Sequence, residues 1–238
     1  MSGFDQFYIE IAGLCAMMNA RFEFSRHHCR DYIIEEPPCV HINAHADDAE
    51  IEREMAAYDA PHGEPYCENI CLYRSIAEQL PKFDRMVFHG AAVSIGGRGF
   101  ILTAPSGSGK TTHIDLLLKN YPSDVEIING DKPIIHVTDE CARVCSTPWA
   151  GKEGMQKNVS QDLCGIVMLR RGAENRIKKI DPAQFFTAIM AQTYFPRDPE
   201  ARMATLELVD KLSNVVDFYL LECNVSDEAA HTSFEFLR

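Results

Sequence analysis

The sequence lacks any long uncharged apolar stretch. Although 46% of its 238 residues are hydrophobic, no run approaches the roughly 18 consecutive apolar residues that indicate a membrane-spanning helix. Near the start, Asp5 and Glu10 interrupt the apolar residues, so no signal peptide is predicted. We therefore expect a cytoplasmic protein without a membrane partner.

Positive charge is also scarce. The chain has 23 Lys and Arg against 35 Asp and Glu, which gives a formal net charge of −12. A surface that binds nucleic acid or anionic lipid needs a concentration of basic residues. The composition therefore disfavours a nucleic-acid partner, although it is compatible with a local basic groove.

A disulfide or zinc framework is missing too. The nine cysteines are an odd number without regular spacing, as expected in a reducing compartment. Cys67 and Cys71 share one face of a predicted helix, but neither belongs to the Cys-x-x-Cys pair that is typical of structural zinc. Other potential ligands lie nearby in the sequence: His27, His28, Cys29, Cys39 and His41. We interpret the thiols as buried apolar side chains and leave zinc binding open.

One stretch, residues 101–112, carries the strongest functional signal. An apolar run ends in a loop of small residues, which is followed by a lysine, two threonines and a helical pattern. This is the layout of a phosphate-binding P-loop, in which backbone N–H groups and the start of a helix surround the phosphates. The predicted phosphate-binding residues are Ser106, Gly107, Ser108, Gly109, Lys110, Thr111 and Thr112.

The individual roles follow from the P-loop pattern. Lys110 is placed to reach the β- and γ-phosphates, and the Thr111 hydroxyl is placed to ligate Mg²⁺. Ala104 stands where the usual G-x-x-x-x-G-K-[ST] pattern begins with glycine. We interpret this as a variant loop, because that first position contributes less to the phosphate cradle. The alternative is a chance Gly/Ser turn before a helix.

The strand that enters this loop is predicted to have an antiparallel neighbour. Residues 88–95 form another apolar run, and residues 96–99 are a Gly-rich turn, so the two runs predict a β-hairpin. In a doubly wound sheet, by contrast, the neighbours of such a strand are parallel and arrive through helices. The predicted fold class is therefore mixed α/β, with a mixed sheet, an antiparallel hairpin leading into the P-loop and flanking helices.

Strand and helix patterns alternate through the rest of the chain. Further strands are predicted at 4–12, 125–128, 134–138, 141–146, 164–169, 176–180 and 216–221, and helices at 66–80, 111–121, 181–191, 199–212 and after Ser226. Phe22 and Phe24 fit a half-buried strand, and residues 46–65 fit a loop or linker. We expect an N-terminal strand-rich segment with one helix, residues 1–83, packed on a P-loop domain, residues 84–238.

Two further residues are predicted to lie beside the P-loop. Asp131 follows the strand 125–128, which we expect next to the P-loop strand, and it stands where phosphoryl-transfer enzymes carry a metal-binding or base carboxylate. His89 begins the antiparallel strand of the hairpin, so we expect it to hydrogen-bond Asp131 or an incoming phosphate. The alternatives are an ordinary turn aspartate and a structural turn histidine.

A second loop, residues 147–154, contains the only tryptophan. Trp149, Lys152 and Glu153 offer a stacking ring, a cation and a carboxylate that would close on a nucleotide, with Glu153 as a metal ligand. The alternative is a solvated surface loop. Arg170 and Arg171, before a glycine, are interpreted as a solvated turn.

The sequences Phe88-His89-Gly90, Ala-Pro-Ser-Gly-Ser-Gly-Lys-Thr at 104–111, and Asn129-Gly130-Asp131 together resemble the HPr serine kinase/phosphorylase family, whose P-loop fold is shared with phosphoenolpyruvate carboxykinase. The resemblance implies a kinase that uses ATP and Mg²⁺. It implies catalytic roles for His89, Lys110 and Asp131. It also implies a Ser acceptor on a small protein or peptide, and a homo-oligomer.

Three functions remain open on the sequence alone. A serine kinase is favoured, and a nucleotide-binding regulator without catalysis is the first alternative, because Gly130 stands where the family often has a second Asp. A carboxykinase-like enzyme acting on a small carboxylic acid is disfavoured, because complete carboxykinases are much longer chains. The choice between ATP and GTP also remains open.

Overall fold

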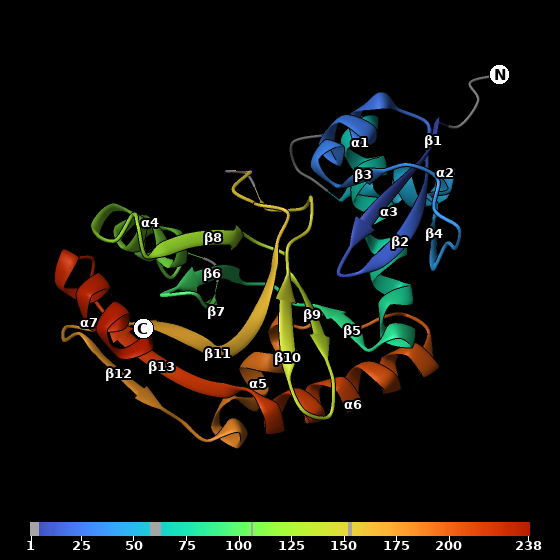
Figure 1. Cartoon of the computed structure of the whole chain (residues 1–238). Coiled ribbons are helices and arrows are strands. Elements are labelled where there is room, and N and C mark those ends of the chain that lie inside the picture. Colours follow the sequence, from blue (N-terminus) through green and yellow to red (C-terminus); the bar gives the residue numbers. More distant parts are fainter. Residues whose placement is uncertain (1–4, 58–62, 106, 152–153) are drawn as a thin grey trace.

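The computed structural model describes residues 5–57, 63–105, 107–151 and 154–238. Figure 1 shows two sheets, a small one formed by the N-terminal residues and a larger one that carries helices on its faces. No helix in the described ranges has both the length and the apolar character needed to cross a membrane.

The small sheet has four strands in the order β3-β1-β2-β4. The strands are β1 (Asp5–Ile11), β2 (Leu14–Ala20), β3 (Ile33–Ile34) and β4 (Ile42–Ala44). Beside them lie α1 (Glu23–His28), α2 (Asp48–Ala56), α3 (Glu64–Gln79) and two 3₁₀ turns at Arg30–Tyr32 and Leu80–Phe83. Alternate residues of β1 and β2 are buried, because one face of the sheet packs on α3.

Two predictions for this region are wrong. Phe22 and Phe24 do not lie in a strand, since α1 begins at Glu23. Residues 48–56, predicted as part of a loop, form α2, so residues 1–83 contain more than one helix. A capping box starts α2: the Asp47 side chain accepts from the Glu50 N–H at 2.7 Å, and the Glu50 side chain accepts from the Asp47 N–H at 3.3 Å. That signature marks the start of a helix whose residues are mostly charged or polar.

The large sheet has nine strands, with the main order β5-β9-β10-β11-β7-β6-β8; β13 pairs with β11, and β12 pairs with β13. The strands are β5 (Arg85–Val87), β6 (Ala91–Ile95), β7 (Arg98–Thr103), β8 (Val125–Asn129), β9 (Ile134–Val137), β10 (Ala142–Cys145), β11 (Ser160–Arg171), β12 (Arg176–Lys179) and β13 (Asp217–Cys223). Antiparallel β6 and parallel β11 flank β7. The predicted mixed α/β class and the hairpin are therefore confirmed.

The hairpin turn is shorter than predicted. Ile95 pairs with Arg98, so the turn consists of Gly96 and Gly97, whose φ angles of 57° and 81° lie in the left-handed region. A two-residue turn with both residues in the left-handed region matches the twist of the two strands. Glycine adopts this backbone conformation without strain.

The position of β8 differs from the prediction. It pairs with β6 and not with the P-loop strand β7. Since both β7 and β8 are antiparallel to β6, they run in the same direction, and their carboxyl ends meet at one edge of the sheet. The residues that follow β8 therefore still lie near the P-loop.

Helices cover both faces of the large sheet, as Figure 1 shows. One face packs on α4 (Lys110–Asn120) and α7 (Asp227–Leu237), and the other on α5 (Pro182–Gln192) and α6 (Pro199–Val215). Along β7, Phe100 and Leu102 belong to the first core and Ile101 to the second. The strand that enters the P-loop is thus held from both sides.

The N-terminal unit and the large sheet share a core. Trp149 is only 5% exposed and lies among the N-terminal core residues, with its ring 5.2 Å from that of Tyr73. The Tyr32 hydroxyl, also buried, lies 2.7 Å from Ser146 Oγ and 2.6 Å from Gln156 Oε1. The prediction that Trp149 stacks on a nucleotide is therefore wrong, because its ring is buried in the packing between the two parts.

Candidate functional site

The loop between β7 and α4 contains two glycines in the left-handed region of backbone conformation. Gly107 and Gly109 have φ angles of 75° and 99°, which glycine adopts readily. The N-cap residue of α4 is Gly109, which has no side chain, and the N–H groups of the first turn point out of the helix end. They border a cavity of about 380 Å³ that Lys110, Thr111 and Thr112 also line. Ser106, predicted to bind phosphate, lies outside the described residues.

Asp131 and His89 meet beside this loop, at the sheet edge where β7 and β8 end. His89 Nε2 lies 3.1 Å from Asp131 Oδ1, and Lys132 Nζ donates to Asp131 Oδ2 at 2.7 Å. Lys110 Nζ lies 3.5 Å from the Gly130 carbonyl oxygen, which joins the loop to the same edge. The three residues predicted as catalytic, His89, Lys110 and Asp131, are thus brought together.

The Asp131 carboxylate is held in its charged form. Partial burial alone would raise its pKa, but the hydrogen bonds from His89 and Lys132 outweigh burial and lower the pKa well below its usual range. Each carboxylate oxygen still has a second lone pair. At neutral pH this carboxylate is therefore ionised and can ligate a hard cation, whereas its lowered pKa makes it a weak proton acceptor.

Asn129 positions Asp131, a role that the sequence analysis missed. Its buried side-chain oxygen accepts from the backbone N–H of Asp131 at 3.0 Å and of Lys132 at 2.8 Å. Its amide nitrogen donates to the Thr147 carbonyl at 2.9 Å. The Gly90 N–H donates to the Asp131 carbonyl at 2.9 Å, which ties the turn to β6. An Asn two residues before an Asp, at a strand end, is the available signal for this turn.

Gly130 occupies a position without room for a side chain. A Cβ there would lie 2.7 Å from the Ala150 carbonyl oxygen, and the Gly130 N–H donates to the Met155 carbonyl at 2.9 Å. A second acid next to Asp131 would therefore displace Ala150 and Met155. The absence of a second Asp follows from this close packing.

We expect Gly130→Ala to lower the free energy of unfolding by about 1–3 kcal/mol, the usual cost of overpacking. Gly63→Ala is the control, because its Cβ would lie 3.6 Å from the nearest atom. Urea unfolding followed by circular dichroism gives both values. Equal stability of the two variants would contradict the close approach of Ala150.

Arg171 lines the loop cavity, whereas the sequence analysis interpreted it as part of a solvated turn. It is the last residue of β11, and its guanidinium donates to the Gly107 carbonyl at 3.0 Å. It also lines a neighbouring cavity of about 350 Å³, whose apolar walls include Leu116, Leu169 and Val225. Arg170 instead pairs with Glu222. No local sequence signal distinguishes the two arginines.

His89 lies between two cavities. It lines the loop cavity and also a cavity of about 440 Å³. Lys132, Tyr194 and two tyrosines of α3, Tyr66 and Tyr73, line that 440 Å³ cavity. A group that enters there therefore meets His89, which also borders the loop cavity.

The remaining metal predictions have separate outcomes. Glu153 and its neighbour Lys152 lie outside the described residues. Within the described ranges, no group of three His, Cys, Asp or Glu side chains is arranged to hold a metal. Cys67 and Cys71 are buried with Ile51 in a small apolar cluster, as predicted.

Comparison with known proteins gives only distant similarity, to solved structures. No family model matches the sequence, and no curated protein matches it. Among solved structures, the HPr(Ser) kinase/phosphatase from Coxiella burnetii aligns over 52% of this chain and 93% of its own, at 12% identity and a TM-score of 0.29. A likeness of this size does not assign the chain to a family.

Proposed function

We propose that the protein is an ATP- and Mg²⁺-dependent kinase that transfers the γ-phosphoryl group to a Ser hydroxyl of a small protein or peptide. The observation that carries the proposal is the ionised Asp131 beside the P-loop. His89 and Lys132 hold it, and His89 lines both the loop cavity and the adjoining 440 Å³ cavity. One cavity then receives the phosphates and the other receives the acceptor.

The loop cavity suits the triphosphate. The start of α4 supplies N–H donors and the positive end of the helix dipole, and Lys110 and Arg171 supply full charges. The 350 Å³ cavity shares Arg171 with it and has the apolar walls that a nucleobase needs. The nucleoside then lies between α4 and the ends of β11 and β13.

The residues that would hold Mg²⁺ are Thr111 and Asp131, with Glu153 as the further predicted ligand. They fit the cation, because Mg²⁺ prefers hard oxygen ligands and usually binds one or two carboxylates together with substrate phosphates. When bound, the cation neutralises charge that develops on the transferred group. Lys110, whose ammonium lies 3.5 Å from the Gly130 carbonyl oxygen, shares that task.

The acceptor hydroxyl approaches through the 440 Å³ cavity. Asp131, which contacts His89 where the two cavities meet, takes the proton of the hydroxyl or holds the metal. His89 and Lys132 keep the carboxylate ionised and fix its orientation. Phosphoryl transfer requires mainly this positioning and charge neutralisation, with little covalent help from the protein.

The structure offers little for the two alternatives. The support for a regulator without catalysis was the absence of a second acid next to Asp131. The close packing of Gly130 against Ala150 gives a steric reason for glycine at this position. No observation favours a small carboxylic acid as substrate. The deciding experiment incubates the protein with γ-labelled ATP and a cell extract. A labelled polypeptide supports the kinase, and bound but untransferred ATP supports the regulator.

Lys110→Ala should abolish the stabilisation of the protein by ATP. A ligand that binds only the folded state raises the melting temperature, and Lys110 supplies the main charge for the β- and γ-phosphates. Differential scanning fluorimetry with ATP and Mg²⁺ measures the shift. Lys119→Ala, on the same helix but paired with Asp227, should keep the wild-type shift. No shift in wild type, or an equal shift in Lys110→Ala, would show that the loop does not bind nucleotide.

A further inference from the structure

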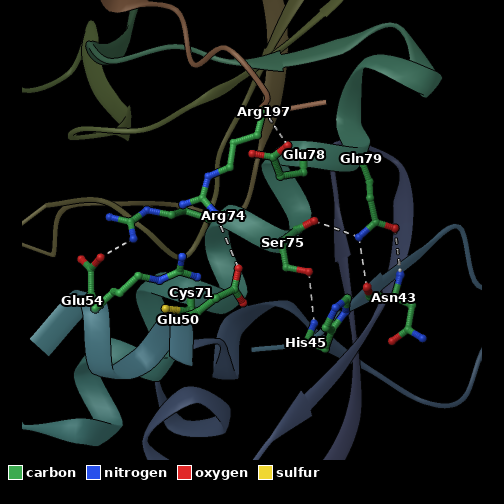
Figure 2. Close-up of a pocket in the computed structure, with 11 residues that line it drawn as sticks. Asn43, His45, Glu50, Glu54, Cys71, Arg74, Ser75, Glu78, Gln79 and Arg197 are labelled. Atoms are coloured by element: carbon green, nitrogen blue, oxygen red, sulfur yellow. Dashed lines mark hydrogen bonds and ion pairs between the residues drawn. The ribbon is translucent and has the colours of Figure 1, made fainter. Parts of the chain in front are cut away.

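The N-terminal unit is joined to the rest of the chain by polar contacts as well as by the shared core. Some of them lie in a cavity of about 760 Å³ between α2, α3, β4 and the segment before α6 (Figure 2). Three arginines and three glutamates line this cavity, so it has no excess of either charge. Glu78 of α3 accepts there from the Tyr194 hydroxyl at 2.7 Å and from the Arg197 N–H at 2.8 Å. These contacts hold α3 on the segment before α6.

A second group of polar contacts lies close to the turn that carries Asp131. Tyr32, which ends the 3₁₀ turn after α1, is buried. Its hydroxyl oxygen lies 2.7 Å from Ser146 Oγ and 2.6 Å from Gln156 Oε1. Ser146 precedes the loop 147–154 in the sequence, and Gln156 follows it. One hydroxyl of the N-terminal unit thus contacts residues on both sides of this loop.

Both partners of Tyr32 also bind the end of β8. Ser146 Oγ donates to the Ile128 carbonyl at 2.7 Å. Gln156 forms an isolated β-bridge with Asn129. Lys157, the next residue, donates its N–H to the same Ile128 carbonyl at 3.1 Å. The last two residues of β8 are therefore held by the two segments that Tyr32 contacts.

Asp31 strengthens the hold on Gln156. The Asp31 carboxylate accepts from Gln156 Nε2 at 3.2 Å, and the Asp31 carbonyl accepts from Asn158 Nδ2 at 2.8 Å. An ionised carboxylate only accepts, so Asp31 sets the orientation of the amide and turns Gln156 Oε1 toward the Tyr32 hydroxyl. The 3₁₀ turn therefore fixes residues 156–158 against β8.

Asn129 connects these contacts to Asp131. Its side-chain oxygen accepts from the backbone N–H groups of Asp131 and Lys132, so a shift of Asn129 moves the turn with it. A displacement of about 1 Å in a reacting geometry can cost on the order of 10²-fold in rate. The contacts of the 3₁₀ turn therefore bear on the position of the carboxylate.

We propose that Tyr32 is a positioning residue for phosphoryl transfer, which acts through Gln156 and Asn129 on Asp131. The proposal rests on the kinase function proposed above. It gives the N-terminal unit a part in the transfer step. The phosphate-binding residues at the start of α4 are not members of this chain of contacts, so loss of the Tyr32 hydroxyl should affect the rate of transfer and not the affinity for ATP.

Hydrogen exchange without nucleotide tests the structural step. Tyr32→Phe keeps the ring in the core and removes only the hydroxyl. We expect the N–H groups of Asp131 and Lys132 to exchange about tenfold faster in this variant, and by a larger factor than the N–H groups of β13. Tyr219→Phe is the matched control, because it removes a hydroxyl that donates to Asp217 in β13. It should leave exchange at Asp131 unchanged.

Gln156→Ala provides a second variant that does not depend on the packing of a buried ring. It breaks the same chain of contacts at a half-buried residue. We expect it to speed exchange at Asp131 about as much as Tyr32→Phe does. Circular dichroism of each variant confirms folding.

A double-mutant cycle tests the transfer step, with γ-labelled ATP and the polypeptide that the cell-extract assay labels. Tyr32→Phe should lower kcat by about tenfold, less than a full 1 Å displacement can cost, and leave the KM for ATP within about twofold. In the Asp131→Asn background the same change should have little further effect, because residues that act through one group are not additive. Tyr219→Phe should keep the wild-type kcat.

Each of four results would overturn the proposal: unchanged exchange at Asp131, an equal rise in exchange at Asp131 and β13, an unchanged kcat, or equal losses of kcat in the wild-type and Asp131→Asn backgrounds. The exchange experiment needs neither ATP nor acceptor. Its failure is therefore distinguishable from failure of the kinase function, which the Lys110→Ala and labelled-ATP experiments report.

Discussion

Asp131→Asn should leave the fold and most of the ATP affinity intact while lowering phosphoryl transfer by about 10²-fold or more, the scale for loss of a positioned acid or base group. The amide keeps the shape of the side chain, and Asn129 still holds the backbone of the turn. The lost feature is the negative charge that accepts the proton or ligates Mg²⁺. Transfer of labelled phosphate under single-turnover conditions measures the effect.

Two variants make this result interpretable. His89→Ala should lose less activity than Asp131→Asn, because His89 orients a carboxylate that Lys132 also holds. Asp139→Asn, in the exposed turn between β9 and β10, should retain full activity. If Asp131→Asn transfers phosphate at nearly the wild-type rate, Asp131 is only a turn residue and the catalytic carboxylate lies elsewhere, with Glu153 the next candidate.

Trp149→Ala should lower the free energy of unfolding by about 3–5 kcal/mol, the usual cost of truncating a buried Trp. The ring packs against Tyr73 and His28, with ring centroids 5.2 Å and 6.2 Å away. Its loss leaves a cavity where the N-terminal unit meets the large sheet. Urea unfolding followed by far-UV circular dichroism avoids reliance on the lost fluorophore.

Trp149→Phe is the matched control. It keeps an aromatic ring in the core and removes the indole N–H, which is buried and has no hydrogen-bond acceptor among the described residues. The cost should therefore be well below that of the alanine variant. A cost for Trp149→Ala of less than about 1 kcal/mol would contradict its place in the shared core.

Local patterns account for the parts of the fold that were predicted. The hairpin, the P-loop helix and the helices after Asp181 and Ser226 each depend on turn or capping residues within a few positions. The partner of β8 and the burial of Trp149 depend on contacts between distant segments, such as Trp149 with Tyr73. No local pattern contains that information.

The candidate site divides in the same way. Lys110 and Asp131 were predicted because the loop and the strand end have recognisable sequence signals, and the structure brings His89 to Asp131. Lys132, Arg171 and the cavity beside Tyr194 were missed. In the sequence, these side chains resemble ordinary surface residues. They join the site because β11 pairs with β7 and because α3 lies beside His89.

The contact of Tyr32 with Ser146 has a consequence for the order of chain synthesis. The two residues are 114 positions apart. At 5–20 residues per second, a ribosome needs about 6 to 23 s to make the intervening chain. During that interval β4 and α3 are synthesised and the small sheet can form, but the surface that Trp149 later covers stays open to water. A nascent chain paused before residue 146 therefore exposes an apolar face to which a chaperone can bind.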